Sequence, residues 1–149
     1  MANFAHIPKI RIFAVLAVFL MAFAPFIVPV ENVSAASGDG GTYAFGTGRN
    51  NYGQMGQGDT DDVLSPARIG DFIGVSGLVA SDSTAFIIED GKVYGFGRNN
   101  LHQQGDGTTN DVLTPKRIGS FTAATAVACS ESTTFVLEGG RLYGFGHNQ

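Results

Sequence analysis

The chain has 149 residues, of which 44% are hydrophobic and 15% are charged. This length is typical of one domain, and the composition is too apolar and too weakly charged for a disordered chain. A single cysteine excludes an internal disulfide and a cysteine-rich zinc site, and a net charge of −4 without a basic cluster argues against a nucleic-acid partner.

The N-terminal segment, residues 1–36, has the features of a secretory signal peptide. Lys9 and Arg11 precede an uncharged apolar run over residues 12–30, and small residues follow at 33–36. A basic start, an apolar centre and a small-residue site in this order are typical of such signals.

We predict cleavage after Ala35 or Ala36, so that residues 37–149 form a secreted or cell-surface protein. Two alternatives are an uncleaved anchor, through which alone the chain would contact a membrane, and a buried core helix. Pro25 and Pro29 disfavour a spanning helix because proline interrupts helical hydrogen bonding. The mature chain carries a net charge of −5, which also disfavours anionic membrane surfaces.

The sequence after the signal is an internal repeat with a period of 49 residues. Residues 49–100 and 98–149 align without gaps, and 26 of the 52 pairs are identical. A long shared stretch is residues 63–70, of which six of the eight residues recur at 112–119. A period near 50 is typical of propellers and solenoids.

A short motif of aromatic residues and glycines marks each copy of the repeat. Tyr-Gly-Phe-Gly at residues 94–97 recurs at 143–146. We align an earlier copy, Tyr-Ala-Phe-Gly at residues 43–46, with the same motif, which makes Thr47 and Gly48 an insertion.

Within each period, the pattern predicts β-strands joined by tight hairpins, and the mature segment shows no helical periodicity. Asp-Gly and Gly-Gly pairs tolerate the backbone conformation that a two-residue hairpin needs. The predicted strands are residues 78–80, 84–88 and 93–96, and in the second copy 135–137 and 142–145.

The sequence Val93-Tyr94-Gly95-Phe96-Gly97-Arg98-Asn99-Asn100, followed by Gln104 to Thr109 and by Thr114-Pro115, resembles the regulator of chromosome condensation repeat in its exported bacterial form. One copy would span residues 41–90, a second 91–139, and a partial copy 140–149. The resemblance implies an all-β fold made of β-propeller blades of antiparallel strands, usually seven blades of four strands each.

Two repeats and a partial third cannot close a ring of seven blades. We therefore expect either about two blades of an incomplete ring, as a fragment of a longer product, or self-association of several chains to complete a propeller. Phenylalanine at residues 45, 96 and 145 also departs from the family's usual tryptophan.

Loop residues at variable positions of the repeat are the candidate contact surface. Exposed loop aromatics often anchor interfaces. The candidates are Tyr52, Asp61, Leu101, His102 and Asp106.

The sequence offers no catalytic, cofactor-binding or metal-binding constellation. The acidic loop at residues 59–62 keeps only one acid in the second copy, at 108–111, whereas a calcium site needs six to eight oxygen ligands. We interpret the repeated acids Asp62 and Asp111 as partners of nearby backbone N–H groups.

Other repeated residues are interpreted as structural. Arg68 and Arg117 would each hold a carboxylate or a backbone carbonyl, and Cys129 would be a small core residue. The aromatic residues of the return strands are expected in the core between blades: Tyr94, Phe96, Tyr143 and Phe145.

Three functions remain open from the sequence. We expect a non-catalytic extracellular scaffold that binds a protein or a glycan. The alternative is part of a propeller enzyme such as a polysaccharide lyase or hydrolase, although the only repeated glutamates, Glu89 and Glu138, lie at hairpin turns. The resemblance also implies guanine-nucleotide exchange as a third function, which the predicted secretory signal and the acidic charge disfavour.

Overall fold

The computed structural model describes residues 34–37 and 41–148. These residues form ten β-strands and no helix, so none of the described ranges contains a helix that could cross a membrane. Of the predicted signal segment, residues 1–36, the part over residues 1–33 lies outside the described residues. Residues 34–36 belong to the first strand and pair with residues 43–45.

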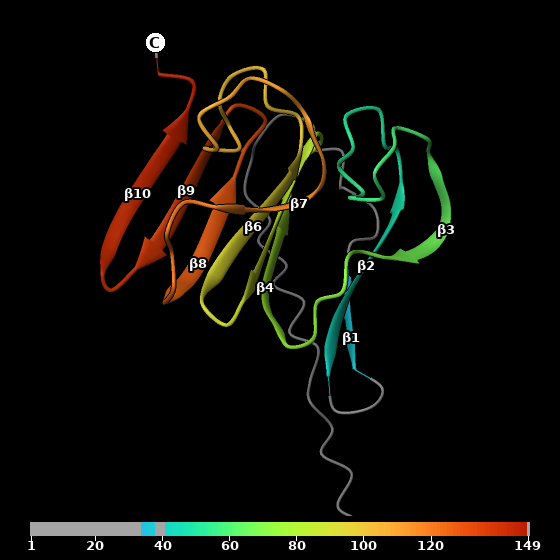
Figure 1. The fold of residues 1–149 in the computed structure, drawn as a ribbon, viewed down its shortest axis with the longest axis horizontal. Coiled ribbons are helices and arrows are strands. Elements are labelled where there is room, and N and C mark those ends of the chain that lie inside the picture. Colours follow the sequence, from blue (N-terminus) through green and yellow to red (C-terminus); the bar gives the residue numbers. More distant parts are fainter. Residues whose placement is uncertain (1–33, 38–40, 149) are drawn as a thin grey trace, which may run out of the picture.

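The strands pair in antiparallel fashion into three sheets that stand side by side (Figure 1). We call these sheets the first, middle and third blades. The first contains β1 (Ser34–Ser37), β2 (Thr42–Gly48) and β3 (Val63–Arg68). The middle blade has the order β4 (Val75–Ala80), β5 (Thr84–Glu89), β6 (Lys92–Gly97) and β7 (Val112–Ile118). The third contains β8 (Ala124–Cys129), β9 (Thr133–Glu138) and β10 (Arg141–Gly146).

The all-β fold of propeller-like blades is confirmed, and so are the predicted hairpins. β5 pairs with β6, and β9 with β10, across the expected Asp-Gly and Gly-Gly turns. The periodicity did not predict β3 and β7, which contain Pro66 and Pro115. Both strands lie at sheet edges, where a residue without an N–H costs no ladder hydrogen bond.

The pairing of β2 corrects the alignment of its aromatic motif. Phe45 pairs with Arg68, as Tyr94 pairs with Arg117 in the middle blade. The 49-residue period therefore continues through β2 without an insertion, and the alignment of residues 43–46 with 94–97 is wrong by two positions.

A repeated bend explains this register. Gly48, Gly97 and Gly146 have φ values of 117°, 101° and 118°, a region that side chains rarely adopt. In both β2 and β6, the pairing shifts just before this glycine, and the chain then leaves the sheet. The glycine at the bend, rather than the aromatic residue before it, therefore sets the alignment, which places Thr47 at the position of Phe96.

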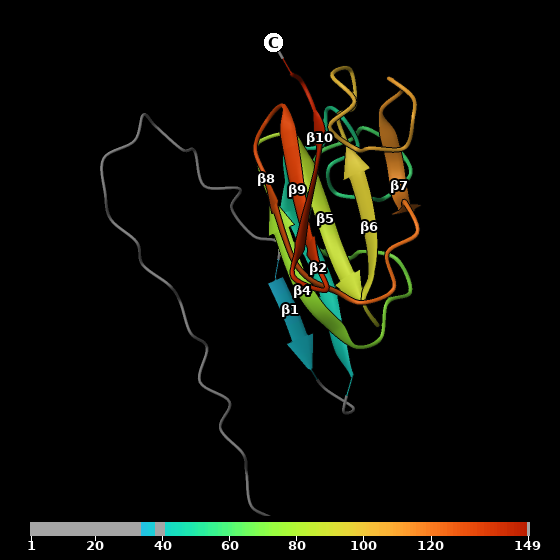
Figure 2. The same cartoon turned by 90° about the vertical axis from the view of Figure 1, so that its left-hand side faces the viewer.

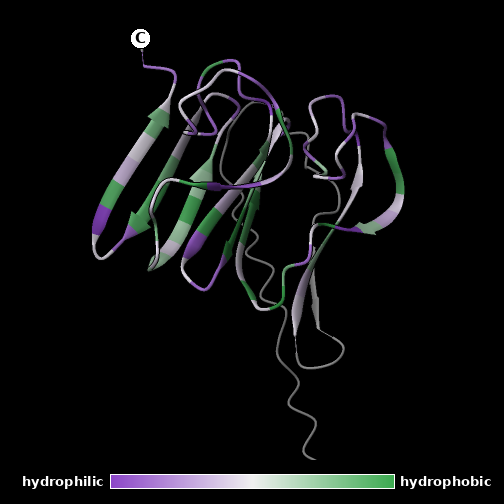
Figure 3. Ribbon diagram, viewed as in Figure 1, coloured by the Kyte–Doolittle hydropathy of each residue, from purple (hydrophilic) through white to green (hydrophobic). Residues whose placement is uncertain are grey.

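Two hydrophobic clusters fill the spaces between neighbouring blades, and they are successive copies of one arrangement. The first joins the first and middle blades, and the second joins the middle and third blades. Ile69, Phe72 and Ile87 in the first correspond to Ile118, Phe121 and Val136 in the second. Figure 3 shows hydrophobic residues on the strands and hydrophilic residues in the loops at the upper end.

The predicted inter-blade aromatic residues take these positions with one exception. Phe96 is fully buried in the first cluster, and Tyr94 contacts the Phe72 ring at 4.9 Å between centroids. Phe145 packs on the second cluster beside Phe86. Tyr143 remains 39% exposed because its blade is open on one side, although its ring lies edge-on to Phe121.

Candidate functional site

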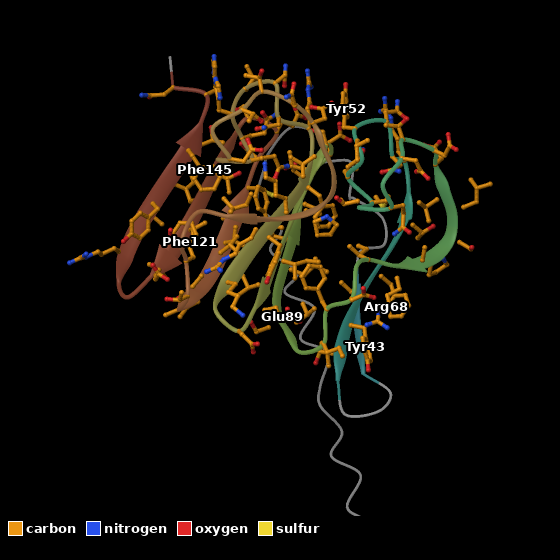
Figure 4. The ribbon with its side chains drawn as sticks, viewed as in Figure 1. Tyr43, Tyr52, Arg68, Glu89, Phe121 and Phe145 are labelled. Atoms are coloured by element: carbon orange, nitrogen blue, oxygen red, sulfur yellow. The ribbon has the colours of Figure 1, made fainter. Side chains whose placement is uncertain are left out.

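The long loops of both repeats emerge at the same end of the blades. The loop at 49–62 follows β2 and the loop at 98–111 follows β6, both at the upper end in Figure 1. Tyr52 lies at this end, whereas Glu89 and Arg68 lie toward the opposite end (Figure 4). We call the upper end the loop face.

A fully buried asparagine organises each loop. Asn50 accepts a hydrogen bond from the Met55 N–H through Oδ1, at 2.8 Å, and its Nδ2 donates to the Asp59 carbonyl at 3.1 Å. Asn99 repeats both bonds, to the Gln104 N–H and to the Thr108 carbonyl. One side chain thus satisfies main-chain groups on both sides of the loop, which fixes its path.

The repeated acids close the two loops at their base. Asp62 accepts a hydrogen bond from the Asn50 N–H at 3.0 Å, and Asp111 accepts one from the Asn99 N–H at 2.8 Å. These bonds match the interpretation of both acids as backbone partners, but they span 12 residues rather than a tight turn. Among the described residues, no group of three or more acids, histidines or cysteines is placed to hold a metal ion.

A repeated glutamine joins each loop to the next blade. Oε1 of Gln54 accepts from the Tyr52 N–H, and its Nε2 donates to the Asp82 carbonyl at 3.2 Å. Gln103 does the same, with the Glu131 carbonyl at 3.0 Å. We call the asparagine, glutamine and acid of each copy the loop framework: Asn50, Gln54 and Asp62, and Asn99, Gln103 and Asp111.

Asp106 serves the interior of its loop. Its carboxylate is only 4% exposed, lies 2.8 Å from the Lys116 ammonium, and accepts hydrogen bonds from Asn99 and Thr108. Burial raises the pKa of this carboxyl, but Lys116 and the hydrogen bonds outweigh it and hold the pKa far below its usual value. The carboxylate of Asp106 is therefore occupied within its own loop and, unlike the other candidates from the sequence, is not available to a partner.

The four remaining candidates lie on the loop face. The guanidinium carbon of Arg98 lies 4.9 Å above the Tyr52 ring, a stacking that links the loop of one repeat to the start of the next. Leu101 is half-buried, whereas His102 and Asp61 are exposed. His102 has a φ of 60° at the position of Gly53, and its Nδ1 lies 3.1 Å from the Thr108 carbonyl oxygen.

The repeated arginines hold backbone carbonyls at the opposite end of the blades. Arg68 donates to the Phe72 carbonyl, and Arg117 to the Phe121 carbonyl, which is one of the two roles expected from their repetition. Arg68 also stacks over Tyr43 (Figure 4). Cys129 packs half-buried against the second cluster, and burial raises the pKa of its thiol.

The repeated glutamates bind the connections between blades. Glu89 accepts a hydrogen bond from the Ile73 N–H at 2.7 Å. Glu138 accepts from Thr122 and Ala123, and these backbone N–H groups lower the pKa of its carboxyl. Each carboxylate is therefore occupied by main-chain donors of the connection that leads into its blade.

The framework was not recognised from the sequence as the source of loop rigidity. The only signal was identity: Asn50, Gln54 and Asp62 are unchanged 49 residues later, while six of the ten residues between them differ. Polar residues that persist through a diverged repeat, beside glycines at the bends, could have indicated buried hydrogen-bonding roles.

Repeated antiparallel sheets, joined by repeated apolar clusters, define a protein of β-propeller blades. The family model described as "Regulator of chromosome condensation (RCC1) repeat" matches residues 39–85 and 90–137, so the chain belongs to this family. No curated protein sequence matches the chain.

A solved relative supports the same fold. The crystal structure of human WBSCR16 matches with a TM-score of 0.61 at 23% sequence identity. The match covers 72% of this chain and 28% of WBSCR16, so the chain spans well under half the length of that relative.

Proposed function

We propose that this chain is an exported, non-catalytic propeller scaffold that binds a protein or a glycan through its loop face. The observation that supports this proposal is that each loop combines repeated, hydrogen-bonded residues with residues that vary between the copies. The framework residues are the same in both copies and are occupied by internal hydrogen bonds. Rigid loops that present variable side chains from a sheet scaffold are a common form of binding surface.

The residues that differ between copies supply the contact chemistry. Tyr52 becomes Leu101, and Gly53 becomes His102. With the exposed Asp61, these side chains offer an aromatic ring, an apolar group, an imidazole and a carboxylate on one face. Such a mixture suits a surface of a protein or a sugar rather than a nucleic acid, which would require a basic patch.

Export is part of the same proposal and rests on the order of basic, apolar and small residues before residue 37. Its test is the mass of the chain recovered from the medium and the cell surface of an expressing bacterium. We expect an N-terminus at Ala36 or Ser37; recovery only from the cytoplasm, with residues 1–36 retained, would contradict export.

The binding proposal is tested by presenting the purified chain to a glycan array and to the proteins of the culture medium. A ligand found in this way should lose at least about tenfold in affinity with the double substitution Tyr52→Ala and His102→Gly, because a loop anchor is typically worth more than about 1 kcal/mol. The matched control is Leu64→Ala in β3, which is exposed but lies outside the loops. Binding that survives the loop substitutions, or that is abolished by Leu64→Ala, would show that the binding site is not on the loop face.

A further inference from the structure

The first strand of the first blade contains the predicted site of signal cleavage. β1 lies beside β2 in Figure 2, and all four of its residues pair with that strand. The pairs are Ser34 with Phe45, Ala35 with Ala44, Ala36 with Tyr43, and Ser37 with Thr42. The two bonds at which we predict cleavage, Ala35–Ala36 and Ala36–Ser37, therefore lie within a paired strand of the folded sheet.

The rest of the first blade holds β2, the partner of this strand, in place. The Ala44 carbonyl accepts a hydrogen bond from the Ile69 N–H at 2.8 Å, and the Thr42 carbonyl accepts one from the Gly74 N–H at 2.9 Å. Ile69 is fully buried in the first cluster and packs over Gly46, where a Cβ would lie 3.1 Å from its Cδ1. Because an isolated hairpin is only marginally stable, the first cluster determines how firmly β1 stays paired.

Pairing of β1 and removal of the signal exclude one another. A peptidase binds the scissile bond and its neighbours as an open chain, so a folded segment is cut only when it opens locally. The cut is a hydrolysis, in which water supplies the hydroxyl of the new carboxyl end and a proton of the new amino end. Cleavage after Ala36 leaves only Ser37 of β1, and cleavage after Ala35 leaves two residues, so the strand is lost in both cases.

We propose that pairing of β1 with β2 determines whether signal peptidase releases this chain, a step that rests on the export proposed above. Chains that are cut before β1 pairs are released without this strand. Chains that pair first keep residues 1–36 and stay attached to the membrane through the apolar run at residues 12–30.

The rates of the two events allow this competition. A hairpin closes in about 1–10 μs, whereas a typical enzyme turns over roughly ten times per second. When opening and closing are fast relative to cleavage, the rate of cleavage follows the fraction of chains that are open. The stability of the first blade therefore sets the ratio of the tethered to the released form.

The test compares two buried isoleucines at equivalent positions of the repeat. Ile69 and Ile118 are 0% and 1% exposed and belong to the first and second clusters, respectively. Alanine at either position removes similar buried volume, and neither change alters the sequence around the cleavage site. In a pulse-labelled bacterium without an outer membrane, the ratio of uncleaved to cleaved exported chain should fall several-fold with Ile69→Ala and should stay unchanged with Ile118→Ala.

A second measurement needs no variant. The purified uncleaved chain in detergent should be cut by signal peptidase many-fold more slowly than a synthetic peptide of residues 25–41. This peptide contains the same cleavage site but lacks β2 (Thr42–Gly48). Equal rates would show that β1 does not protect the bond in the folded chain and would overturn the proposal.

A protease added to the intact cells separates this proposal from the proposed export. We expect it to digest both the cleaved and the uncleaved form. Digestion of neither form would show that the chain is not exported and would overturn both proposals. Digestion of the cleaved form alone, or an equal fall of the ratio in the two isoleucine variants, would overturn the role of β1 and leave export standing.

Discussion

Single polar side chains determine the shape of the loops, and Asp106 is the most heavily bonded acid among the described residues. Its carboxylate accepts hydrogen bonds from Lys116, Asn99 and Thr108, and it is almost completely buried. An exposed ion pair contributes little to stability, but a buried acceptor with several donors contributes more because each donor would otherwise lose its partner. The same environment makes this loop sensitive to acid.

We expect the stability supplied by Asp106 to be present at neutral pH and to be lost on acidification. The pKa of this carboxyl is lower in the folded than in the unfolded chain, so protonation favours unfolding as the pH falls below the ordinary aspartate value of about 4. Asp106→Asn should lower the free energy of unfolding by about 1.5–3 kcal/mol at pH 7. It should also weaken the decrease of this free energy at acidic pH. Urea unfolding between pH 3 and pH 7 measures both effects.

Asp61→Asn is the matched control for this measurement because Asp61 is an exposed acid in the equivalent loop of the first repeat. Its substitution should change neither the unfolding free energy at pH 7 nor the decrease of that free energy on acidification. An equal loss in the two variants would show that the charge of the chain, rather than the bonds of Asp106, governs the acid response.

At the scale of the element, each strand that leads into a loop ends at a glycine bend. A Cβ at Gly97 would overlap the carbonyl oxygen of Ser83, which accepts the Arg98 N–H at 2.8 Å. Gly107 also has a positive φ, of 80°, but a Cβ there would meet nothing within 4 Å. Alanine substitutions at the two glycines therefore distinguish the cost of backbone strain from the cost of steric overlap.

We predict that Gly107→Ala costs about 1–2 kcal/mol, the strain of a side chain in this backbone region. Gly97→Ala should cost about 3–4 kcal/mol, because the overlap adds the loss of a buried hydrogen bond to the same strain. Urea midpoints of the two variants give the comparison. Equal costs would mean that β6 relaxes around the new methyl group, so that the bend itself, and not the approach to Ser83, requires glycine.

Elements with strong local signals were predictable from the sequence, and those that depend on partners were not. A short run of β-branched and aromatic residues, followed by an Asp-Gly turn, identified β5 and β6. β7 contains proline and polar residues, so only its pairing with β6 makes it a strand. Tyr52 and His102 were chosen as contact candidates because they lie at loop positions that vary between copies. Buried and exposed loop acids look alike in sequence, which is why Asp106 was grouped with Asp61.

At the scale of the whole molecule, the contribution of a side chain to stability depends on which blade contains it. Phe86 and Phe135 occupy equivalent positions in successive blades, yet one is fully buried and the other is 44% exposed. We predict that Phe86→Ala costs about 3–5 kcal/mol, as for a core phenylalanine, and that Phe135→Ala costs only about 1 kcal/mol. Urea unfolding of the two variants tests this; equal costs would contradict the assignment of Phe135 to an open face.

The bonds of Gln54 and Gln103 to the next blade have a consequence for how such chains diversify. In the next blade, both glutamines donate to main-chain oxygens, those of Asp82 and Glu131. Every residue has such an oxygen, so residues 82 and 131 can change without weakening the junction between modules. The glutamine bond therefore persists when whole repeats are exchanged, duplicated or shuffled by recombination, and only the apolar clusters between blades restrict which side chains a new neighbour brings.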